Sequence, residues 1–432
     1  MMSYAKSRLS GNKLFVLFAI TLLPLCIYGQ TETKKLNLNE AVKIGLKNNP
    51  EVRSAIENIS ASKGRFWSRI SLPQPEVGVS YEYAPVNSSS SNYSEKTLEV
   101  SQSFEFPSNY FLKGSKFNKE EKIAFYELNL TERSVINQVK TSYYKIIAKQ
   151  YQVKSSEENL LISEDFFKKA EIRQNVGEGT NLERLTAKVQ YTEARNNLEV
   201  LKNELTTAFA ELNYSLGFGK QSYEANFDLT DTLVFVDHKI SLEEVYKSME
   251  ETNPQIKIAE LKYAITSVEK GLAWSSLLPN INLAYFKQTR DGNNGFYGAS
   301  IGITVPLWFM FDQRGKIQEA AANQSISESE LQLTKNEVAL KIKNAFTDHE
   351  INLKQVKLYV NDILPQAEEI YRTAIKSYDA GELTYLEYLQ AKQTLISSQN
   401  NYINVLFNHY QSVFRIEEIV GLNIIDKSEL EK

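Results

Sequence analysis

The stretch Gly177-Glu178-Gly179-Thr180-Asn181-Leu182-Glu183-Arg184-Leu185 occurs in this chain in two versions. The second version, Gly381-Glu382-Leu383-Thr384-Tyr385-Leu386-Glu387-Tyr388-Leu389, begins 204 positions after the first. The same spacing relates Asn49-Pro50 to Asn253-Pro254, far upstream of both. Matches spread this widely in one ungapped register indicate an internal duplication. A repeat this long corresponds to half a domain, because solenoid repeats span only about 20–50 residues.

Each version of the stretch is typical of a turn between two long helices. The glycine that opens it tolerates the left-handed backbone conformation that ends a helix. Thr180 offers its hydroxyl to the first free amides of the next helix, and Glu183, three residues on, completes a Thr-x-x-Glu capping box. Thr384 and Glu387 repeat this pattern. The chain is therefore predicted to fold back on itself at two equivalent helical tips.

The amino terminus has the features of a secretory signal. Three basic residues precede the uncharged apolar run Leu14–Ile27, which is too short for a comfortable membrane helix. We expect residues 1–29 to form a signal peptide and the mature chain to start at Gln30. The only cysteine, Cys26, lies inside this signal, where the bulky Leu25 before it disfavours lipidation. The mature chain then has no thiol and depends on packing, not on disulfides.

The remaining chain, 30–432, is predicted to be a single domain made of two repeats, about 36–219 and 240–423. A net charge of −4 with 24% charged residues argues against a nucleic-acid binder that works through bulk basicity. No stretch after the signal is apolar for about 18 residues, so no transmembrane helix is expected there.

Strand-like segments lie near 76–106 in the first repeat and near 281–306 in the second, where apolar residues fall at every second position. Each strand is about ten residues long, the length of a tilted membrane-spanning β-strand. A soluble hairpin with one buried face is the alternative. A lipid-facing row should be continuously apolar, and two rows are: Val77, Val79, Tyr81 and Tyr83, and Tyr297, Ala299, Ile301, Ile303 and Val305. Gln102 and Lys287 interrupt the other two.

After the strands of each half, the apolar residues take a helical period. Ser108 to Asn175 contains no proline, and a continuous helix there would be about 100 Å long. Its partner runs from Thr180 to about Leu216. Apolar residues alternate in steps of four and three, as coiled-coil packing requires, at Ala194, Leu198, Leu201, Leu205, Ala208 and Leu212, and again at Ile342, Phe346, His349, Leu353, Val356, Val360 and Ile363. Pro365 interrupts the second long helix and is expected to kink it.

Four membrane-length strands cannot close a barrel, since the smallest single-chain barrels have eight. An open sheet edge is not tolerated in lipid. If the strands enter a membrane, the protein must oligomerise: a trimer would supply twelve strands and a dimer eight. The paired helices would then extend the barrel into a helical tube, and the function that this shape predicts is a conduit.

Over Leu36–Gly421 the chain resembles the TolC family of outer-membrane efflux proteins in three features. These are the duplicated segments that end in Asn49-Pro50 and Asn253-Pro254, the paired strands, and the two Gly-x5-Glu-x-Leu tips. The segments Leu72–Pro75 and Ser101–Pro107 are more similar to the heavy-metal branch of CusC/CzcC-like proteins than to the drug or protein-secretion branches.

The resemblance implies a mainly α fold with a membrane β-hairpin pair. In a TolC-like homotrimer, a twelve-stranded β-barrel in the outer membrane continues as a long α-helical coiled-coil barrel in the periplasm. The implied function is the outer-membrane channel of a tripartite efflux system, a passive conduit whose substrates include metal ions. The implied partners are a periplasmic adaptor, an inner-membrane RND-type pump and outer-membrane lipid. Two alternatives stay open: a periplasmic coiled-coil scaffold or tether, and a TolC-like channel for type I protein secretion or drug export.

Glu183 and Glu387 resemble the acidic position near the aperture where the family narrows its pore, so we expect them at a gate. The capping box alone also accounts for both carboxylates. Ala187 and Ala391 stand where a second acidic ring would lie. Leu383 replaces the basic residue that ties the TolC-type gate shut, so a gate here is expected to be less ionic.

Gly177 and Gly381 match the tip glycines that the adaptor is thought to touch in the family. With Gly179 and Leu383 they form the predicted adaptor-docking tips. Turn chemistry alone also explains the glycines.

The sequence contains no nucleophile elbow, no phosphate-binding loop and no Cys/His metal cluster. His238, His349 and His409 are the only histidines, and no two have metal-ligand spacing. His349 falls on an apolar seam, which favours a packed, hydrogen-bonded histidine over a ligand. We therefore expect no enzyme activity, no metal site and no cofactor.

The three tryptophans, Trp67, Trp274 and Trp308, lie near the ends of predicted strands. Trp308 in particular suits an interfacial aromatic girdle of a membrane barrel, although an ordinary core position is an equal alternative.

Overall fold

The computed structural model describes residues 34–84, 86, 93–220, 227–237 and 240–421. The predicted signal peptide, the predicted start of the mature chain and His238 lie outside these residues.

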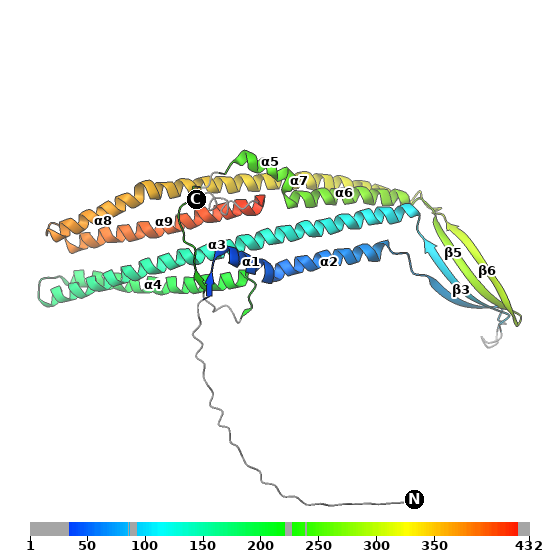
Figure 1. The fold of residues 1–432 in the computed structure, drawn as a ribbon, viewed down its shortest axis with the longest axis horizontal. Helices are drawn as coiled ribbons and strands as arrows, with labels where there is room; N and C mark the ends of the chain where they lie inside the picture. The colour runs from blue at the N-terminus through cyan, green and yellow to red at the C-terminus, as the bar shows by residue number, and fades with distance from the viewer. Residues whose placement is uncertain (1–33, 85, 87–92, 221–226, 238–239, 422–432) are drawn as a thin grey trace, which may run out of the picture.

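The chain passes through two similar series of elements (Figure 1). After β1 (Lys34–Leu36), the first series is α1 (Leu38–Asn48), α2 (Pro50–Ile70), β2 (Glu76–Glu82), β3 (Glu95–Phe104), α3 (Pro107–Asn175) and α4 (Asn181–Ser215). After β4 (Phe227–Leu229), which pairs with β1, the second series is α5 (Leu242–Thr252), α6 (Pro254–Ser275), β5 (Asn280–Arg290), β6 (Asn293–Thr304), α7 (Asp312–Leu358), α8 (Leu364–Asp379) and α9 (Tyr385–Val420).

Corresponding helices of the two series begin and end alike. α2 and α6 both start at a proline, and the side chains of Asn49 and Asn253 accept hydrogen bonds from amides two residues on, at 2.8 and 2.9 Å. Asparagine is a strong N-cap, and proline suits the first helical position because the amide there has no helical partner. Gly217 and Gly421 follow α4 and α9 with φ of 78° and 79°.

The longest predicted helix is confirmed: α3 has 69 residues and is unbroken from Pro107 to Asn175. The expected disturbance at Pro365 is also present, as a π-helical turn over Tyr359–Ile363 between α7 and α8. Proline has no amide to donate and its ring clashes with the preceding turn, so the helix widens there. No described helix combines the length and the apolar character that crossing a membrane requires.

The long helices lie side by side in one layer (Figure 1). α3 packs against α2 and α4 on one side and against α6 and α9 on the other, and α7 packs against α6 and α9. The largest core cluster lies where α1, α3, α4 and α9 meet. At its centre Tyr143 is fully buried and donates a hydrogen bond to the carbonyl of Leu36 at 2.8 Å. α2 and α4 therefore lie at one lateral edge of the layer, and α7 and α8 at the other.

The strands form an antiparallel sheet in the order β2-β3-β5-β6. Residues paired across strands point to the same side of a sheet. The register aligns Val79 with Leu98 and Tyr285 with Ala299, and so joins all the predicted rows on one side. That apolar side comprises Val77, Val79, Tyr81, Leu98, Val100, Phe104, Ile281, Leu283, Tyr285, Tyr297, Ala299, Ile301 and Ile303. The opposite side is mainly polar, with Ser80, Thr97, Glu99, Ser101, Asn282, Ser300 and Thr304, and also carries Phe286 and Phe296.

Gln102 and Lys287 lie on the apolar side but towards opposite ends of the sheet, and Lys96 and Thr289 lie on the same side, level with Tyr81 and beyond Lys287. Gln102 lies near the helices and donates to the carbonyl of Pro73 at 2.7 Å. The row between Gln102 and Lys287 is apolar and uncovered in the single chain, where Val77 is 69% exposed.

Candidate functional site

Both predicted tips lie at the end of the molecule farthest from the sheet (Figure 1). Gly177 has φ of 83° and Gly381 has φ of 75°, and a Cβ added to either would meet no atom within 4 Å. Replacing them would strain the backbone without displacing a packed neighbour. At Gly179, in contrast, a Cβ would lie 3.1 Å from the backbone carbon of Arg173, so this glycine permits a close approach.

The two predicted gate glutamates have different partners. Glu387 completes its capping box, since its Oε2 accepts from the amide and the hydroxyl of Thr384, both at 2.8 Å. The amide of Thr384 lowers the pKa of the Glu387 carboxyl. Glu183 donates its amide to the Thr180 hydroxyl at 3.1 Å, but its carboxylate pairs with Arg173 at 3.1 Å. The complete capping box predicted at Thr180 is therefore wrong, because a cation in the last turn of α3 competes for the carboxylate.

Near the tips, a tyrosine on α9 joins the two helical hairpins, α3–α4 and α8–α9. The hydroxyl of Tyr385 donates to Asp165 of α3 at 3.1 Å, and the ammonium of Lys169 lies 5.2 Å from the Tyr385 ring centre. Beside them, Phe166 and Leu389 are buried in a small core cluster shared by both hairpins. Burial and the Asp165 carboxylate both raise the pKa of the Tyr385 hydroxyl. Sequence reasoning missed this contact, which spans 220 positions.

A groove of about 560 Å³ lies between α8 and α9 near their tip. Leu383 and Glu387, which were predicted to serve docking and gating respectively, both line it, with Ile370 and Ala391. The structure therefore places these two positions on one surface.

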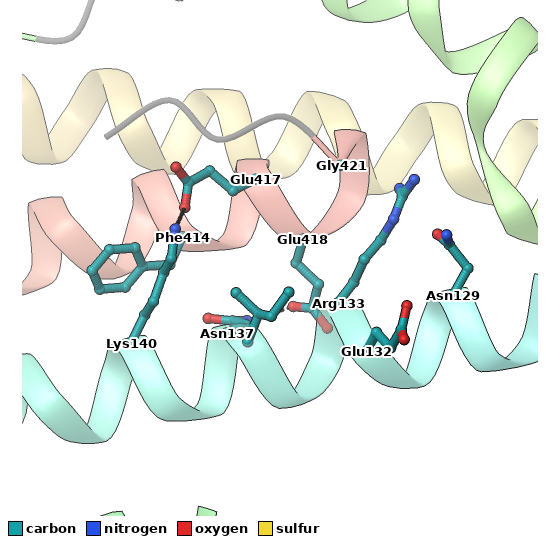
Figure 2. A pocket seen from close by; sticks show the side chains of 10 residues that line it. Asn129, Glu132, Arg133, Asn137, Lys140, Phe414, Glu417, Glu418 and Gly421 are labelled. Carbon is teal, nitrogen blue, oxygen red and sulfur yellow. Dashed lines mark hydrogen bonds and ion pairs between the residues drawn. The ribbon is translucent and has the colours of Figure 1, made fainter. Parts of the chain in front are cut away.

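Midway along the molecule, a pocket of about 310 Å³ lies between α3 and the end of α9 (Figure 2). At its side, Lys140 and Glu417 form an ion pair of 2.8 Å, with side chains only 5% and 7% exposed. Arg133 donates to the carbonyl of Ile419 at 3.4 Å, and burial lowers the pKa of its guanidinium. These contacts tie the first repeat to the second.

The described histidines are packed, as predicted for His349. That side chain is 3% exposed, with Nδ1 3.3 Å from the hydroxyl of Ser412. Its ring stacks on that of His409, with centres 5.2 Å apart, a proximity that the sequence spacing does not reveal. Within the described residues, no group of three or more His, Cys, Asp or Glu side chains could hold a metal ion.

The lateral edges of the layer carry large apolar side chains that nothing in the described chain covers. On α7 they recur every seven or eleven residues, which keeps them on one face of a helix: Ile326, Leu333, Leu340, Ile351 and Leu358. On α4 they are Leu182, Leu185, Val189, Val200 and Tyr214. Within the described strands, β2 and β6 each pair on one side only.

Comparison with known proteins gives consistent matches. Residues 42–218 and 245–422 match the family described as "Outer membrane efflux protein". The chain is 20% identical, over 390 residues, to the cobalt-zinc-cadmium resistance protein CzcC of Cupriavidus metallidurans, covering 89% of this chain and 90% of that protein. The CmeC outer membrane channel of Campylobacter jejuni has a similar structure, with a TM-score of 0.75 at 16% identity over 91% of this chain and 89% of that one. CusC is also similar, with a TM-score of 0.74 at 15% identity over 89% and 92%.

These matches confirm the predicted fold, which is mainly α with a β-hairpin pair and TolC-like. They also confirm the resemblance on which the predicted function depends.

Proposed function

Because the chain belongs to the outer membrane efflux protein family, we propose that three copies of it close into one tube. The chain is an outer-membrane channel component of an efflux system, located in the outer membrane and extending into the periplasm.

The observation that carries the proposal is the sheet, which is mainly apolar on one side, mainly polar on the other and unpaired at both edges within the described strands. Unpaired strand edges are not stable in lipid, so β2 of one copy must pair with β6 of the next. Three copies give a twelve-stranded barrel with the polar side towards its lumen. The apolar stripe of α7 then packs against α4 of the neighbouring copy and continues the closure into the helical layer.

The proposed partners are a periplasmic adaptor and an inner-membrane RND-type pump. The tip positions Gly177, Gly179, Gly381 and Leu383 are proposed to receive the adaptor. The tips are exposed, and the groove beside Leu383 offers apolar contacts from Ile370, Ala374, Leu383 and Ala391 to a partner helix.

Glu183 and Glu387 are proposed to lie at the aperture of the tube. Both are on the first turn of the helix that follows a tip, so a threefold assembly brings six carboxylates to one end. Arg173 neutralises Glu183, which leaves Glu387 as the larger source of negative charge at the aperture.

The proposed substrates are divalent metal ions, since the protein CzcC is named for cobalt, zinc and cadmium resistance. The channel is passive: no enzyme activity and no cofactor are proposed. A channel for drug export or type I protein secretion is the alternative.

The test is growth of cells that lack the native protein, complemented with variants and challenged with cobalt, zinc or cadmium salts. We expect the wild type to restore resistance and Gly381→Trp to fail while forming normal amounts of oligomer. Gly292→Trp is the matched control, because Gly292 also has positive φ and open surroundings but lies in the β5–β6 turn at the other end of the molecule. If the cells that lack the native protein become sensitive to drugs but stay resistant to the metal salts, the channel serves drug export instead. Full metal resistance in the Gly381→Trp variant would mean that the adaptor does not dock at this tip.

A further inference from the structure

Two helices at the lateral edges of the layer are duplicates of two helices that pack against each other inside it. α6 repeats α2 at the spacing of 204, as Asn49-Pro50 and Asn253-Pro254 show, and α7 repeats α3 at a spacing of 203. Val139 and Ile342, which share the second spacing, are both buried. The identical residues at this spacing are Lys113 and Lys316, Ile123 and Ile326, Glu127 and Glu330, Leu128 and Leu331, Leu130 and Leu333, Thr131 and Thr334, and Val135 and Val338.

A π-helical turn accounts for the difference between the two spacings. The tips are 204 positions apart, so the second repeat has one residue more between Val338 and Gly381 than the first has between Val135 and Gly177. The π-helical turn Tyr359–Ile363 lies in this interval, and such a turn holds one residue more than an α-helical turn. α7 therefore aligns with α3 at 203, and α8 aligns with the last part of α3 at 204.

Within the chain, α3 packs against α6 and α9, and we call this contact the inner seam. The ammonium of Lys116 on α3 lies 2.7 Å from the carboxylate of Glu269 on α6. Close by, Leu112 of α3 touches Gly271 of α6, where an added Cβ would lie 3.4 Å from the leucine. The duplicates of these helices, α7 and α2, lie at opposite lateral edges of the layer (Figure 1), so a second copy is needed to bring such a pair together.

The charged pair of the inner seam has a duplicate with both signs reversed. The position equivalent to Lys116 is Glu319 on α7, and the position equivalent to Glu269 is Arg65 on α2. Both side chains are exposed, and neither forms an ion pair within the part of the chain that the structure describes. Opposite charges at equivalent positions keep their attraction when both are exchanged, so α7 of one copy suits α2 of the next.

The neighbouring contact is duplicated with the large and the small residue exchanged. Leu112 corresponds to Gly315 on α7, and Gly271 corresponds to Trp67 on α2. Trp67 is 70% exposed, and a Cβ added to Gly315 would meet no atom within 4 Å. A glycine leaves room for a large ring to lie on the helix backbone, as Gly271 leaves room for Leu112.

Towards the tips, two further contacts of the inner seam have exposed apolar duplicates. Asn137 of α3 donates to Glu418 of α9, and the equivalent residues, Leu340 and Tyr214, are 60% and 59% exposed.

Phe166 and Leu389 are buried together in the inner seam. Their equivalents, Ile370 and Leu185, are 50% and 45% exposed. The residues that the edges leave uncovered are thus the duplicates of residues that the inner seam covers.

We propose that a second copy of this chain covers these edges in the register of the inner seam, with α7 and α8 of one copy against α2 and α4 of the next. In this outer seam Arg65 pairs with Glu319 of the neighbouring copy, and Trp67 lies on its Gly315. The inference rests on the proposed function and adds to it the residues by which the copies recognise each other.

The reversal of charge also selects the correct pair of helices. An α2 that took the place of α6 beside α3 would bring Arg65 against Lys116. An α6 in the outer seam would bring Glu269 against Glu319. Like charges in both exchanged arrangements disfavour them, so the duplicated helices do not replace one another.

The first experiment exchanges the charges. Arg65→Glu or Glu319→Arg alone should shorten the half-life of the detergent-solubilised trimer about fivefold, and the double variant should restore it. Arg53→Glu is the matched control, because Arg53 is also exposed on α2 but its equivalent, Lys257, pairs with Glu260 on its own helix. Native mass spectrometry during dilution measures the half-life. A double variant no more stable than the single ones, or single variants equal to Arg53→Glu, would refute the pair.

The second experiment needs only small substitutions. Arg65→Cys and Glu319→Cys in one chain, treated in membranes with a short bismaleimide, should give covalent dimers and trimers on a denaturing gel. The pair Arg53→Cys and Glu319→Cys should not, since Arg53 lies 12 positions from Arg65, about 18 Å along the helix. Single-cysteine variants control for Cys26. A product that stays at the monomer mass, or equal products from both pairs, would contradict the proposed register.

The wild type, measured in parallel, separates the two levels of the proposal. If it forms trimers and restores metal resistance while Arg65 and Glu319 neither compensate nor cross-link, the register of the outer seam is wrong and the proposed function stands. A wild type that stays monomeric refutes both.

Discussion

The guanidinium of Arg173 lies 3.1 Å from the carboxylate of Glu183, across the tip that joins α3 to α4. At the equivalent position of the second repeat, Glu387 is held by the amide and hydroxyl of Thr384 and has no such cation in the described structure. The duplication has thus produced two tips with one backbone geometry and different electrostatics.

Ion selectivity should follow this difference. Like charges around a constriction favour cations, so the reconstituted channel is expected to be cation-selective in a planar bilayer. Glu387→Gln should reduce that selectivity more than Glu183→Gln, and more than Glu387→Asp. Arg173→Gln should increase it, because Glu183 then keeps its full charge. Unchanged reversal potentials in the Glu183→Gln, Glu387→Gln double variant would assign Glu387 to helix capping only, and Glu183 only to its ion pair with Arg173.

The bond between Tyr385 and Asp165 should hold the two hairpins together and restrict opening. Tyr385→Phe removes one hydrogen bond, worth about 1 kcal/mol, and should raise the population of the open conformation about fivefold. Single-channel recording measures this as open probability. Tyr371→Phe is the control, since that hydroxyl lies 3.4 Å from the hydroxyl of Tyr388 within the α8–α9 hairpin. If both variants behave alike, the contact between the hairpins is not a restraint.

The buried pair of Lys140 and Glu417 should matter greatly for stability. Glu417→Ala leaves the Lys140 ammonium buried without its carboxylate, and should lower the free energy of unfolding by about 3–5 kcal/mol. The double variant Lys140→Met, Glu417→Leu should recover most of it. Asp312→Ala breaks the exposed pair with Lys316 and should have an effect of at most about 1 kcal/mol. Denaturant unfolding in detergent measures the free energy of unfolding of all three variants. A loss in Glu417→Ala no larger than the loss in Asp312→Ala would contradict the prediction.

Stability should decline in mild acid because of His409. Burial lowers the pKa of its imidazole below the ordinary value of 6.5. Its neighbours Asp237 and Lys357 form an ion pair and act on it in opposite directions. The unfolded chain therefore takes up this proton at higher pH than the folded chain, so stability is complete above pH 6.5 and is lost as the pH falls below it. As the pH falls below 6.5, the midpoint of thermal unfolding should decrease in the wild type and should decrease less in His409→Gln. If the midpoint depends on pH equally in both proteins, a group other than His409 causes the effect.

The helix ends and the strands could be predicted because their signals are local. Thr384 and Glu387 contain within four residues everything needed for a capping box, and the structure uses them as predicted. Because apolar residues alternate along each strand, the sequence predicts which residues share an apolar face. The register in the structure then places the apolar faces of all four strands on one side of the sheet.

The contacts that distinguish the two tips could not be predicted, because they depend on how separate helices are placed. Glu183 has the sequence context of a capping box, and only the approach of Arg173 across the turn shows its second partner. Tyr385 and Asp165 lie in different repeats, and no local pattern fixes the offset between two hairpins. The exposure of Trp67, Trp274 and Trp308 likewise required the packing of the helices beside them.

The mass of the detergent-solubilised protein tests the central claim most directly. One chain supplies four strands whose outer members are unpaired within the described sheet, so the account predicts a complex of three copies, stable on dilution. Native mass spectrometry should give three times the mass of the mature chain. A stable monomer or dimer would contradict the account.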